Sequence, residues 1–360
     1  MLFLRSQSVR GGEGVRLPGR HTVAWSDVEG PEDDVLEGWH CGFSGQRLRF
    51  SAINLYQLTE WVIKPLTRAA NRSYVEEVTT EPSAQKPSWF VSHWWGEPVF
   101  AFVRLLEKHL ETRQLEAEAT AYWICAYANR QHDVGGELGR DPMQSSFLKA
   151  MALSEGVVLV LDTVGPATPF SRIWCCFEEG VVVLAKRGLL NIGGAQGREA
   201  LGALLARDGR EGRRAPLKLD MVTEGDFAGL PVALTDGYTD EEARCDRQLR
   251  ETGNGHSGAY LKSSRERSFP VEIIETALAI DIRGAQASIP VDKTRILNSL
   301  AGRSGNALDG EAEACHDAWT AVNHSLRSTF ALTVWPKVVA GGKSVSSPTG
   351  GGGLKPGLAL

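Results

Sequence analysis

The feature that most constrains the fold is an alternation of short apolar segments with segments of helical spacing between residues 88 and 222. Three apolar segments are predicted to form strands: Trp89–Ser92, Ala121–Ala128 and Val157–Leu161. The more polar segment Leu217–Val222 is a candidate fourth strand. Continuous apolar runs of this kind are typical of strands that are buried on both faces. Repeated strand–helix alternation predicts a parallel sheet wrapped by helices, with right-handed crossovers.

The segments between these strands carry apolar residues three and four positions apart, as in helices with one buried face. They are predicted as helices over Pro98–Arg113, Gln144–Ser154 and Ser171–Arg187. Pro98 suits the first helical position, and Gly188 is a typical stop signal after the third helix. The expected fold class is therefore α/β, with additional helices before and after the sheet.

The rest of the chain is expected to surround this core with extensions. Residues 1–50, rich in Gly, Pro and charge, are expected to be poorly ordered, and residues 51–87 to form a helical extension and linker. Residues 88–222 form the α/β core, residues 223–335 a mainly helical C-terminal extension, and residues 336–360 a disordered tail.

Several elements are predicted within these extensions. Asn54–Asn71 has an apolar stripe at helical spacing, and Pro65 should kink or divide that helix. Gly253–Arg267 is predicted as a loop. Further helices are predicted over Tyr238–Thr252, Pro270–Ala287, Val291–Ala301 and Ala312–Leu332.

Composition excludes several classes of function. The 39 basic and 44 acidic side chains give a net charge of −5, so a general nucleic-acid partner is not expected. No apolar run reaches about 18 residues, so no membrane-spanning helix is expected, and the first apolar segment is too short for a secretory signal. The six cysteines are scattered through the chain, which indicates reduced thiols and a cytoplasmic location.

Polar side chains gather where the predicted strands end. Ser92, His93 and Glu97 follow the first strand, Asp162 follows the third, and Glu178 lies in the second turn of the third helix. If the sheet has the flavodoxin-like order 2-1-3-4-5, the first and third strands are neighbours and their following loops flank one ligand-binding crevice. The N-terminal end of the third helix would then favour phosphate or carboxylate groups.

Three segments carry motifs in a fixed order. The first segment, FVSHWWGE, is similar to the pattern F-[IV]-S-[HF]-x-x-[GE]-[ED]. The second segment, SFLKAMALSEGVVLVLD, is similar to I-x-x-A-[IL]-x-x-S-x-x-x-[VI]-[VI]-[VL]-[VL]-S. The third segment, SRIWCCFEE, is similar to S-x-x-W-C-x-x-E-L. Together these segments resemble the Toll/interleukin-receptor (TIR) domain family over about residues 88–222. The sequence departs from the family at Asp162, where Ser is usual, at Trp95, and in the longer region after the third helix.

The resemblance implies a flavodoxin-like sheet and two possible functions. Some TIR domains hydrolyse NAD⁺ or NADP⁺ and release nicotinamide, and the glutamate of their W-C-x-x-E motif, Glu178 in this chain, is the catalytic residue. The dinucleotide is then a substrate, and no cofactor is expected. Other members are interaction modules that signal by self-association. The residues expected to line the nucleotide site are Ser92, His93, Trp94, Trp95, Asp162, Trp174 and Cys175.

This chemistry is consistent with the side chains present. Nicotinamide leaves as a neutral molecule from a positively charged ring, so the general acid of an ordinary glycosidase is not needed. One carboxylate near the ribose can stabilise the developing positive charge, and Trp94 or Trp95 could stack on a ring of the dinucleotide. The long loop after the second strand, which contains Asn129, His132, Asp133 and Glu137, could close over the ligand.

The same residues also have structural interpretations. Glu178 is the kind of residue that usually lies on the solvated face of a helix. Ser92 and His93 could cap the following helix, and Trp94 and Trp95 could pack in the core. A non-catalytic scaffold and a different nucleotide-binding enzyme on the same fold are the alternative functions.

Three other chemistries are weaker alternatives. Cys175 and Cys176 are expected to be small buried hydrophobes, although a cysteine nucleophile with His93 as its base is conceivable. A zinc site made of His93, His132 and Cys176 lacks a recognised ligand spacing. Arg207–Arg214 is expected to be a solvated loop, or else a site that attracts anions.

Overall fold

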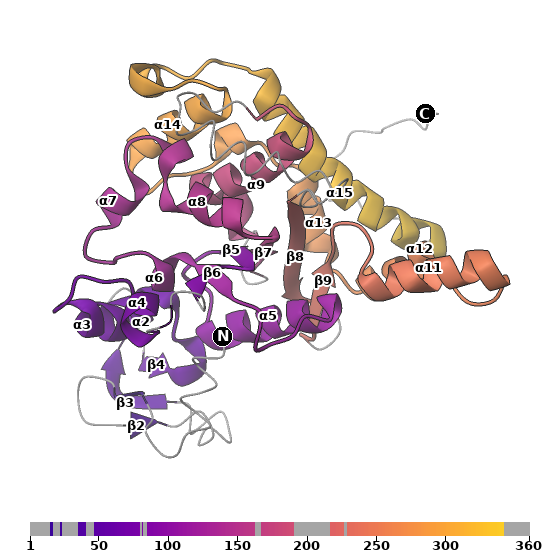
Figure 1. Cartoon of the computed structure of the whole chain (residues 1–360), viewed down its shortest axis with the longest axis horizontal. Helices are drawn as coiled ribbons and strands as arrows, with labels where there is room; N and C mark the ends of the chain where they lie inside the picture. The colour runs from indigo at the N-terminus through magenta and orange to yellow at the C-terminus, as the bar shows by residue number, and fades with distance from the viewer. Residues whose placement is uncertain are drawn as a thin grey trace, which may run out of the picture.

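A five-stranded sheet with helices on both faces forms the centre of the protein (Figure 1). The architecture comes from a computed structural model. The structure describes residues 15–16, 22–23, 35–40, 47–79, 81, 85–162, 167–190, 217–226 and 229–341.

The sheet has the order β6-β5-β7-β8-β9, which is 2-1-3-4-5 in order of the chain, as predicted. Its strands are β5 (Trp89–Ser92), β6 (Tyr122–Ile124), β7 (Gly156–Val160), β8 (Lys218–Glu224) and β9 (Pro231–Leu234). The first four are parallel, and β5 lies between β6 and β7. The carboxyl ends of β5 and β7 are therefore neighbours, as the predicted crevice requires.

The sheet is mixed rather than purely parallel, because β9 runs antiparallel to β8. Few residues connect Glu224 with Pro231, whereas a parallel crossover needs about a dozen or more, so the chain can only return as a hairpin. Strand β9 was not predicted, since four residues are too few to show a clear alternation.

The second strand is shorter than predicted. Strand pairing stops at Ile124, and Cys125–Ala128 forms the short helix α6 instead of continuing the strand. The side-chain amide of Gln131 donates hydrogen bonds to the carbonyls of Cys125 and Ala126, at 3.1 and 3.0 Å. Alanine has a high helix propensity, so this Ala-rich stretch folds as a turn of helix once its carbonyls are satisfied.

The two faces of the sheet bury different side chains. Trp89, Val91 and Val158 pack under α5 (Val99–Arg113), with Pro98 as its N-cap residue rather than its first helical residue. Side chains of the other face, such as Phe90 and Leu159, lie in the second core. That core includes α8 (Ser146–Leu153) and α9 (Ile173–Lys186), which agree with the predicted helices.

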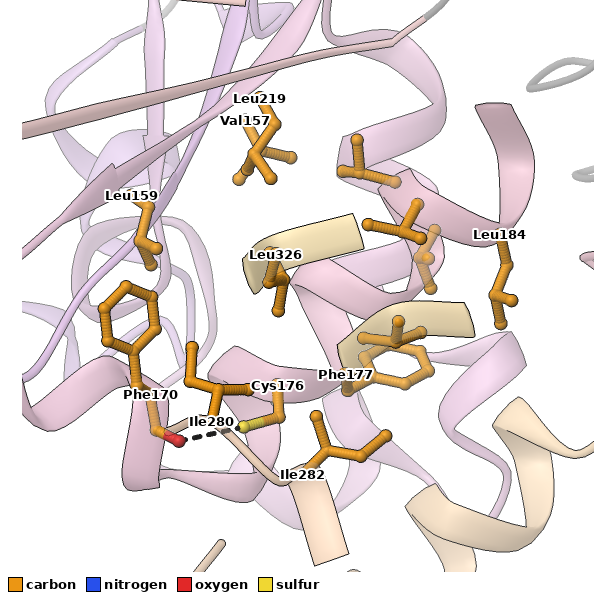
Figure 2. Packing of buried hydrophobic residues seen from close by; sticks show 14 of the residues in the cluster. Val157, Leu159, Phe170, Cys176, Phe177, Leu184, Leu219, Ile280, Ile282 and Leu326 are labelled. Atoms are coloured by element: carbon orange, nitrogen blue, oxygen red, sulfur yellow. Dashed lines mark hydrogen bonds between the residues drawn. The ribbon is translucent and has the colours of Figure 1, made fainter. Parts of the chain in front are cut away.

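The C-terminal extension covers the outer side of α9. Figure 2 shows Ile280, Ile282 and Leu326 packed into the same core as Phe177 and Leu159. The helices of the extension are α11 (Asp240–Thr252), α12 (Gly258–Glu266), α13 (Val271–Leu278), α14 (Pro290–Leu300) and α15 (Asp317–Gly341). Because helices pack on α9 opposite the sheet, α9 is buried on nearly all sides.

Three predictions for this extension were wrong. Gly253–Arg267 contains the helix α12 rather than only a loop. The helix predicted over Pro270–Ala287 ends at Leu278, and a 3₁₀ turn (Ile282–Gly284) follows. Helix α15 continues to Gly341, into the predicted disordered tail, whose residues 342–360 lie outside the described residues.

The segment before the sheet is helical, as predicted. It contains α2 (Leu55–Leu58), a π-helical turn (Thr59–Ile63), α3 (Lys64–Thr67) and α4 (Tyr74–Val78). The helical run is continuous from Leu55 to Thr67, so Pro65 does not divide it. The regular hydrogen bonding is instead interrupted by the π-helical turn, which ends two residues before Pro65, and proline cannot donate the regular hydrogen bond.

The described parts of residues 1–50 contain two short antiparallel pairs. These are β1 (Val15–Arg16) with β2 (Thr22–Val23), and β3 (Val35–His40) with β4 (Arg47–Arg49). The segment Arg207–Arg214 lies outside the described residues. Within the described part of the chain, no helix is both long enough and apolar enough to span a membrane.

Candidate functional site

Glu178 and Ser92 lie together at the carboxyl end of β5. Ser92 is the last residue of β5, and its side chain is buried. Glu178 is only 5% exposed, and its Oε2 atom has no hydrogen-bond partner. Burial raises the pKa of Glu178, and the nearby Ser92 hydroxyl lowers it by a smaller amount. No hydrogen bond of standard geometry joins the two groups. The structure therefore places Glu178 in the interior rather than on a solvated helix face.

The burial of Glu178 follows from the position of α9. This helix is covered by the sheet on one side and by the C-terminal helices on the other, so even its polar residues lose contact with water. Desolvation raises the pKa of Glu178 from 4.5 to about 8. Its neighbour Glu179 is 0% exposed, neither of its carboxyl oxygens has a hydrogen-bond partner, and burial raises its pKa well above the usual value.

Two thiols and one imidazole lie beside this carboxyl group. The Cys175 thiol donates to the carbonyl of His93 at 3.9 Å, and Cys125 Sγ lies 4.0 Å from His93 Nε2. Burial raises the pKa of Cys125 to about 12 and that of Cys175 well above its usual value, and the charge of Glu178 adds to both shifts. Desolvation lowers the pKa of His93 to about 4, so the imidazole is neutral near pH 7.

These contacts bear on the alternative of a cysteine nucleophile. The His93 ring lies near the thiol of Cys125, a residue that was not a candidate from the sequence. The thiol of Cys176 instead contacts the carbonyl of Phe170 at 3.5 Å. Nucleophilic cysteines are thiolates with lowered pKa values. The raised pKa of Cys125 describes a thiol that stays protonated, so this arrangement does not favour nucleophilic catalysis.

The three predicted tryptophans lie in different surroundings. The Trp94 ring lies so close to Gly96 that a Cβ atom there would be 2.1 Å from it, so a larger residue at this position would displace the ring. Trp95 donates from Nε1 to Cys125 Sγ at 2.9 Å. Trp174 donates from Nε1 to Asp292 Oδ2 at 3.1 Å, which directs this indole toward α14. The structure thus links Trp95, through Cys125, to the surroundings of Glu178, whereas the indole of Trp174 is held by α14.

A second group of carboxyl side chains lies at the same edge of the sheet. Glu97 is 7% exposed, and its Oε2 atom has no hydrogen-bond partner. Burial, together with the charges of Asp162 and Glu224, raises the pKa of Glu97 to about 8. Glu97 and Asp162 were singled out from the sequence, whereas Glu224, at the end of β8, was missed.

Asp162 also fixes the chain that leads into α9. Its carboxylate accepts hydrogen bonds from the backbone N–H of Thr168 at 2.5 Å and from the Thr168 hydroxyl at 2.9 Å. The first backbone N–H of α9, at Ile173, donates to the carbonyl of Gln286 at 2.9 Å. Part of the helix end that was predicted to attract anions is thus occupied by the C-terminal extension.

A buried ionic network on the α5 side of the sheet was missed by the sequence analysis. Asp220, in the middle of β8, is fully buried and accepts from Arg113 Nε at 2.7 Å and from Arg113 Nη2 at 2.6 Å. His109 Nε2 lies 3.0 Å from Asp220 Oδ2, and His109 Nδ1 lies 2.6 Å from the Tyr122 hydroxyl. The available signal was an acidic residue between two apolar ones, Leu219 and Met221, in the middle of the candidate fourth strand.

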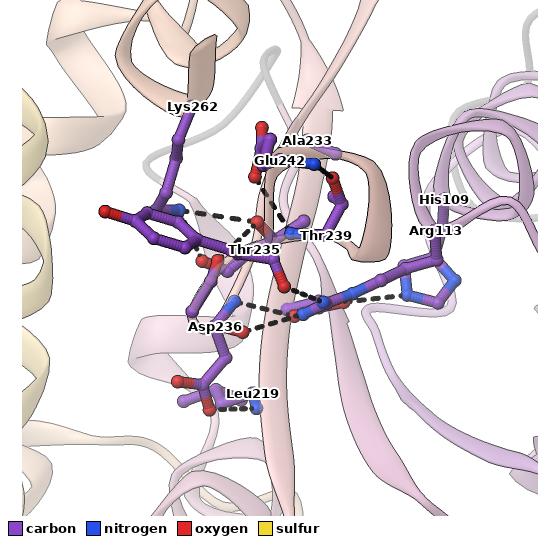
Figure 3. Close-up of polar contacts among 12 residues, drawn as sticks. His109, Arg113, Leu219, Ala233, Thr235, Asp236, Thr239, Glu242 and Lys262 are labelled. Carbon is purple, nitrogen blue, oxygen red and sulfur yellow. Dashed lines mark hydrogen bonds and ion pairs between the residues drawn. The ribbon is translucent and has the colours of Figure 1, made fainter. Parts of the chain in front are cut away.

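This network continues into the C-terminal extension (Figure 3). Arg113 Nη2 donates to the carbonyl of Asp236 at 2.9 Å, and the Asp236 backbone N–H donates to Asp220 Oδ1 at 2.8 Å. Its hydrogen bonds keep the pKa of Asp220 well below the usual value, despite burial. Each charged group has a partner, so the network is consistent with a structural role that joins α5, β8 and the segment after β9.

The residues considered for zinc do not gather in one place. His132 Nε2 lies 2.9 Å from the carbonyl of Lys64, and Cys176 contacts the carbonyl of Phe170. Across the described ranges, no group of three His, Cys, Asp or Glu side chains is placed to hold a metal ion.

Comparison with known proteins identifies no relative. No protein-family description, curated protein or solved structure matches this chain. The fold and the site therefore define a class only: an α/β protein with a largely parallel five-stranded sheet, whose carboxyl edge carries buried carboxyl groups on α9 and after β5.

Proposed function

We propose that this protein is a TIR-like NAD(P)⁺ nucleosidase that uses Glu178 to release nicotinamide. The observation that carries the proposal is the buried Glu178 carboxyl, without a hydrogen-bond partner for Oε2, beside Ser92 at the end of β5. In open α/β sheets, ligands bind beyond the carboxyl ends of the strands where the strand order reverses. β5 is the strand from which the chain leads to neighbours on both sides.

The proposed reaction needs one ionised carboxyl group. The bond between C1′ of the ribose and the ring nitrogen breaks, and its electron pair neutralises the positive charge of the nicotinamide ring. Water attacks C1′ and loses a proton, which gives ADP-ribose (or its 2′-phosphate), nicotinamide and H⁺. The Glu178 carboxylate stabilises the positive charge that develops on the ribose, and such stabilisation is strongest where water is excluded.

The raised pKa of Glu178 is compatible with this role. Near pH 7 the free protein holds this carboxyl mainly in its neutral form. The positively charged nicotinamide ring favours the ionised form, because an opposite charge nearby lowers the pKa of an acid. Binding of the substrate would thus create the charge that the reaction uses.

Purified protein incubated with NAD⁺ or NADP⁺, with nicotinamide followed by chromatography, tests the proposal. Glu178→Gln keeps the shape of the side chain but cannot ionise, so turnover should fall by at least about 100-fold, as for other lost electrostatic stabilisers. Glu275→Gln changes an exposed glutamate on α13 and is the matched control. Wild-type turnover in Glu178→Gln would remove this residue from the mechanism, and no turnover by the wild-type protein would remove the enzyme.

A non-catalytic scaffold is the second candidate. The observation in its favour is that the structure closes the site: Glu178 is 5% exposed, and the first N–H of α9 is bonded to Gln286. Sedimentation velocity over a range of concentrations separates the two functions. A concentration-dependent assembly without nicotinamide release supports the scaffold, whereas a monomer with turnover excludes self-association as its main role.

A further inference from the structure

A hollow is lined by residues of α5, of the edge strand β9, and by Arg265 and Ser268. Figure 1 shows α5 on the opposite side of the sheet from α9. The volume of the hollow is about 740 Å³, within the range of about 300–1,000 Å³ typical of small-molecule sites. Much of its lining is apolar and includes the buried Val232 and Ala233 of β9 and the half-buried Leu110 of α5. Leu230, also in the lining, is 61% exposed, so it offers apolar surface that a ligand can cover.

The outer edge of β9 is not available to an added strand. Arg265 Nη1 donates to the carbonyl of Ala233 at 2.7 Å, and the backbone N–H of Thr235 donates to Glu266 Oε1 at 2.9 Å. Pro231 has no N–H to offer. An extended peptide that pairs with a sheet edge needs these backbone groups, so the structure argues against a strand as the occupant of the hollow.

One cation of the hollow has no side-chain partner among the described residues. This is Arg104, whose guanidinium makes no hydrogen bond or ion pair with any of them. Two other cations of the lining are already engaged: Lys108 Nζ lies 2.9 Å from Glu111, and Arg265 Nε lies 2.9 Å from Glu242 Oε1. Arg104 is therefore the group best placed to receive a negative charge from a ligand.

We propose that this hollow binds a small organic anion with an apolar body. The planar guanidinium of Arg104 binds the carboxylate or phosphate group through bidentate hydrogen bonds, a geometry that arginine can provide and lysine cannot. The body of the ligand covers Leu230 and removes its apolar surface from water. This site is separate from the proposed nucleosidase site, and neither proposal depends on the other.

Saturation-transfer NMR on the full chain, with octanoate, acetate and 1-octanol as probes, tests the proposal. Octanoate carries both recognition elements, whereas acetate lacks the apolar body and 1-octanol lacks the charge. Octanoate should bind at least tenfold more tightly than either of the other two. Equal binding of 1-octanol and octanoate would overturn the assignment of an anion site, and no binding of octanoate would overturn the site altogether.

Two variants and one control locate the binding. Arg104→Gln removes no ion pair among the described residues and should weaken octanoate about tenfold without changing 1-octanol. Leu230→Asp changes a residue that is mostly exposed, so the fold should tolerate it, and octanoate binding should be lost. Arg247→Gln, at an exposed arginine of α11, should bind octanoate as the wild type does. Wild-type binding by Arg104→Gln would refute the role of Arg104.

Discussion

Glu178→Gln should stabilise the folded protein, and the gain should depend on pH. The pKa of Glu178 is 4.5 in the unfolded chain and about 8 in the folded protein. The folded state therefore holds the proton more tightly. The contribution of Glu178 to the free energy of unfolding is thus most favourable below pH 4.5. Its stability falls as the pH rises toward 8, because the unfolded state releases the proton first.

The size of the effect follows from this interval. Each pH unit between the two pKa values changes the free energy of unfolding by about 1.4 kcal/mol. From pH 4.5 to pH 7 the loss amounts to about 3 kcal/mol, with no reduction for solvent screening because Glu178 is 5% exposed. Glutamine has a similar shape and no charge, so Glu178→Gln avoids this loss. Since most substitutions destabilise, a gain of this size would be diagnostic.

Urea denaturation at pH 5 and pH 7.5 measures the difference. We expect Glu178→Gln and the wild type to be nearly equal in stability at pH 5, and the variant to be more stable by about 2–4 kcal/mol at pH 7.5. Glu275→Gln, at an exposed position, should show no such dependence on pH. An equal difference at both pH values, or a variant that is less stable at pH 7.5, would refute the burial argument.

Three further predictions concern the ionic network, the sheet and the pH dependence of the proposed reaction. Asp220→Ala leaves the buried guanidinium of Arg113 without its carboxylate and should destabilise the protein by about 3–5 kcal/mol in urea denaturation; a loss below 1 kcal/mol would contradict the role of the network. Gly156→Ala places a Cβ atom 2.4 Å from the ring of Trp89 and 2.9 Å from the backbone of Lys218. This overpacking should lower the free energy of unfolding, measured by urea denaturation, by about 1–3 kcal/mol. If the nucleosidase proposal holds, kcat/KM should rise with pH and level off above about pH 8, where the α9 carboxyl of the free enzyme is ionised; a profile that is flat from pH 6 to 9 would contradict it.

The strands and helices of the core were predictable because their signals are local. A run such as Val157–Leu161 is apolar at every position, which is typical of a strand covered on both faces. Helix α12 was not predictable in this way, because its sequence is polar. It is held by ion pairs with distant residues, such as Arg265 with Glu242 on α11, and a single sequence does not show these contacts.

The strand order was predictable, but the environment of the candidate site was not. The order that makes β5 and β7 neighbours agrees with the expectation from the sequence, and Ser92 lies beside Glu178 in the structure. The burial of Glu178 could not be inferred, because the groups beside its carboxyl, such as Ser92 of β5 and Cys125 of α6, come from distant parts of the chain. The contact between Cys125 and His93 was missed because the chain leaves the strand at Cys125 to form α6.

The position of α9 between the sheet and the C-terminal helices has a consequence for how the protein unfolds. Side chains such as Leu326 and Phe330 belong to the same apolar cluster as Val157 and Leu159 of β7. A chain shortened at residue 222 would uncover one whole side of α9 and expose that cluster to water. The α/β part and the helices after it should therefore melt in a single cooperative transition, with no stable fragment of either part left behind.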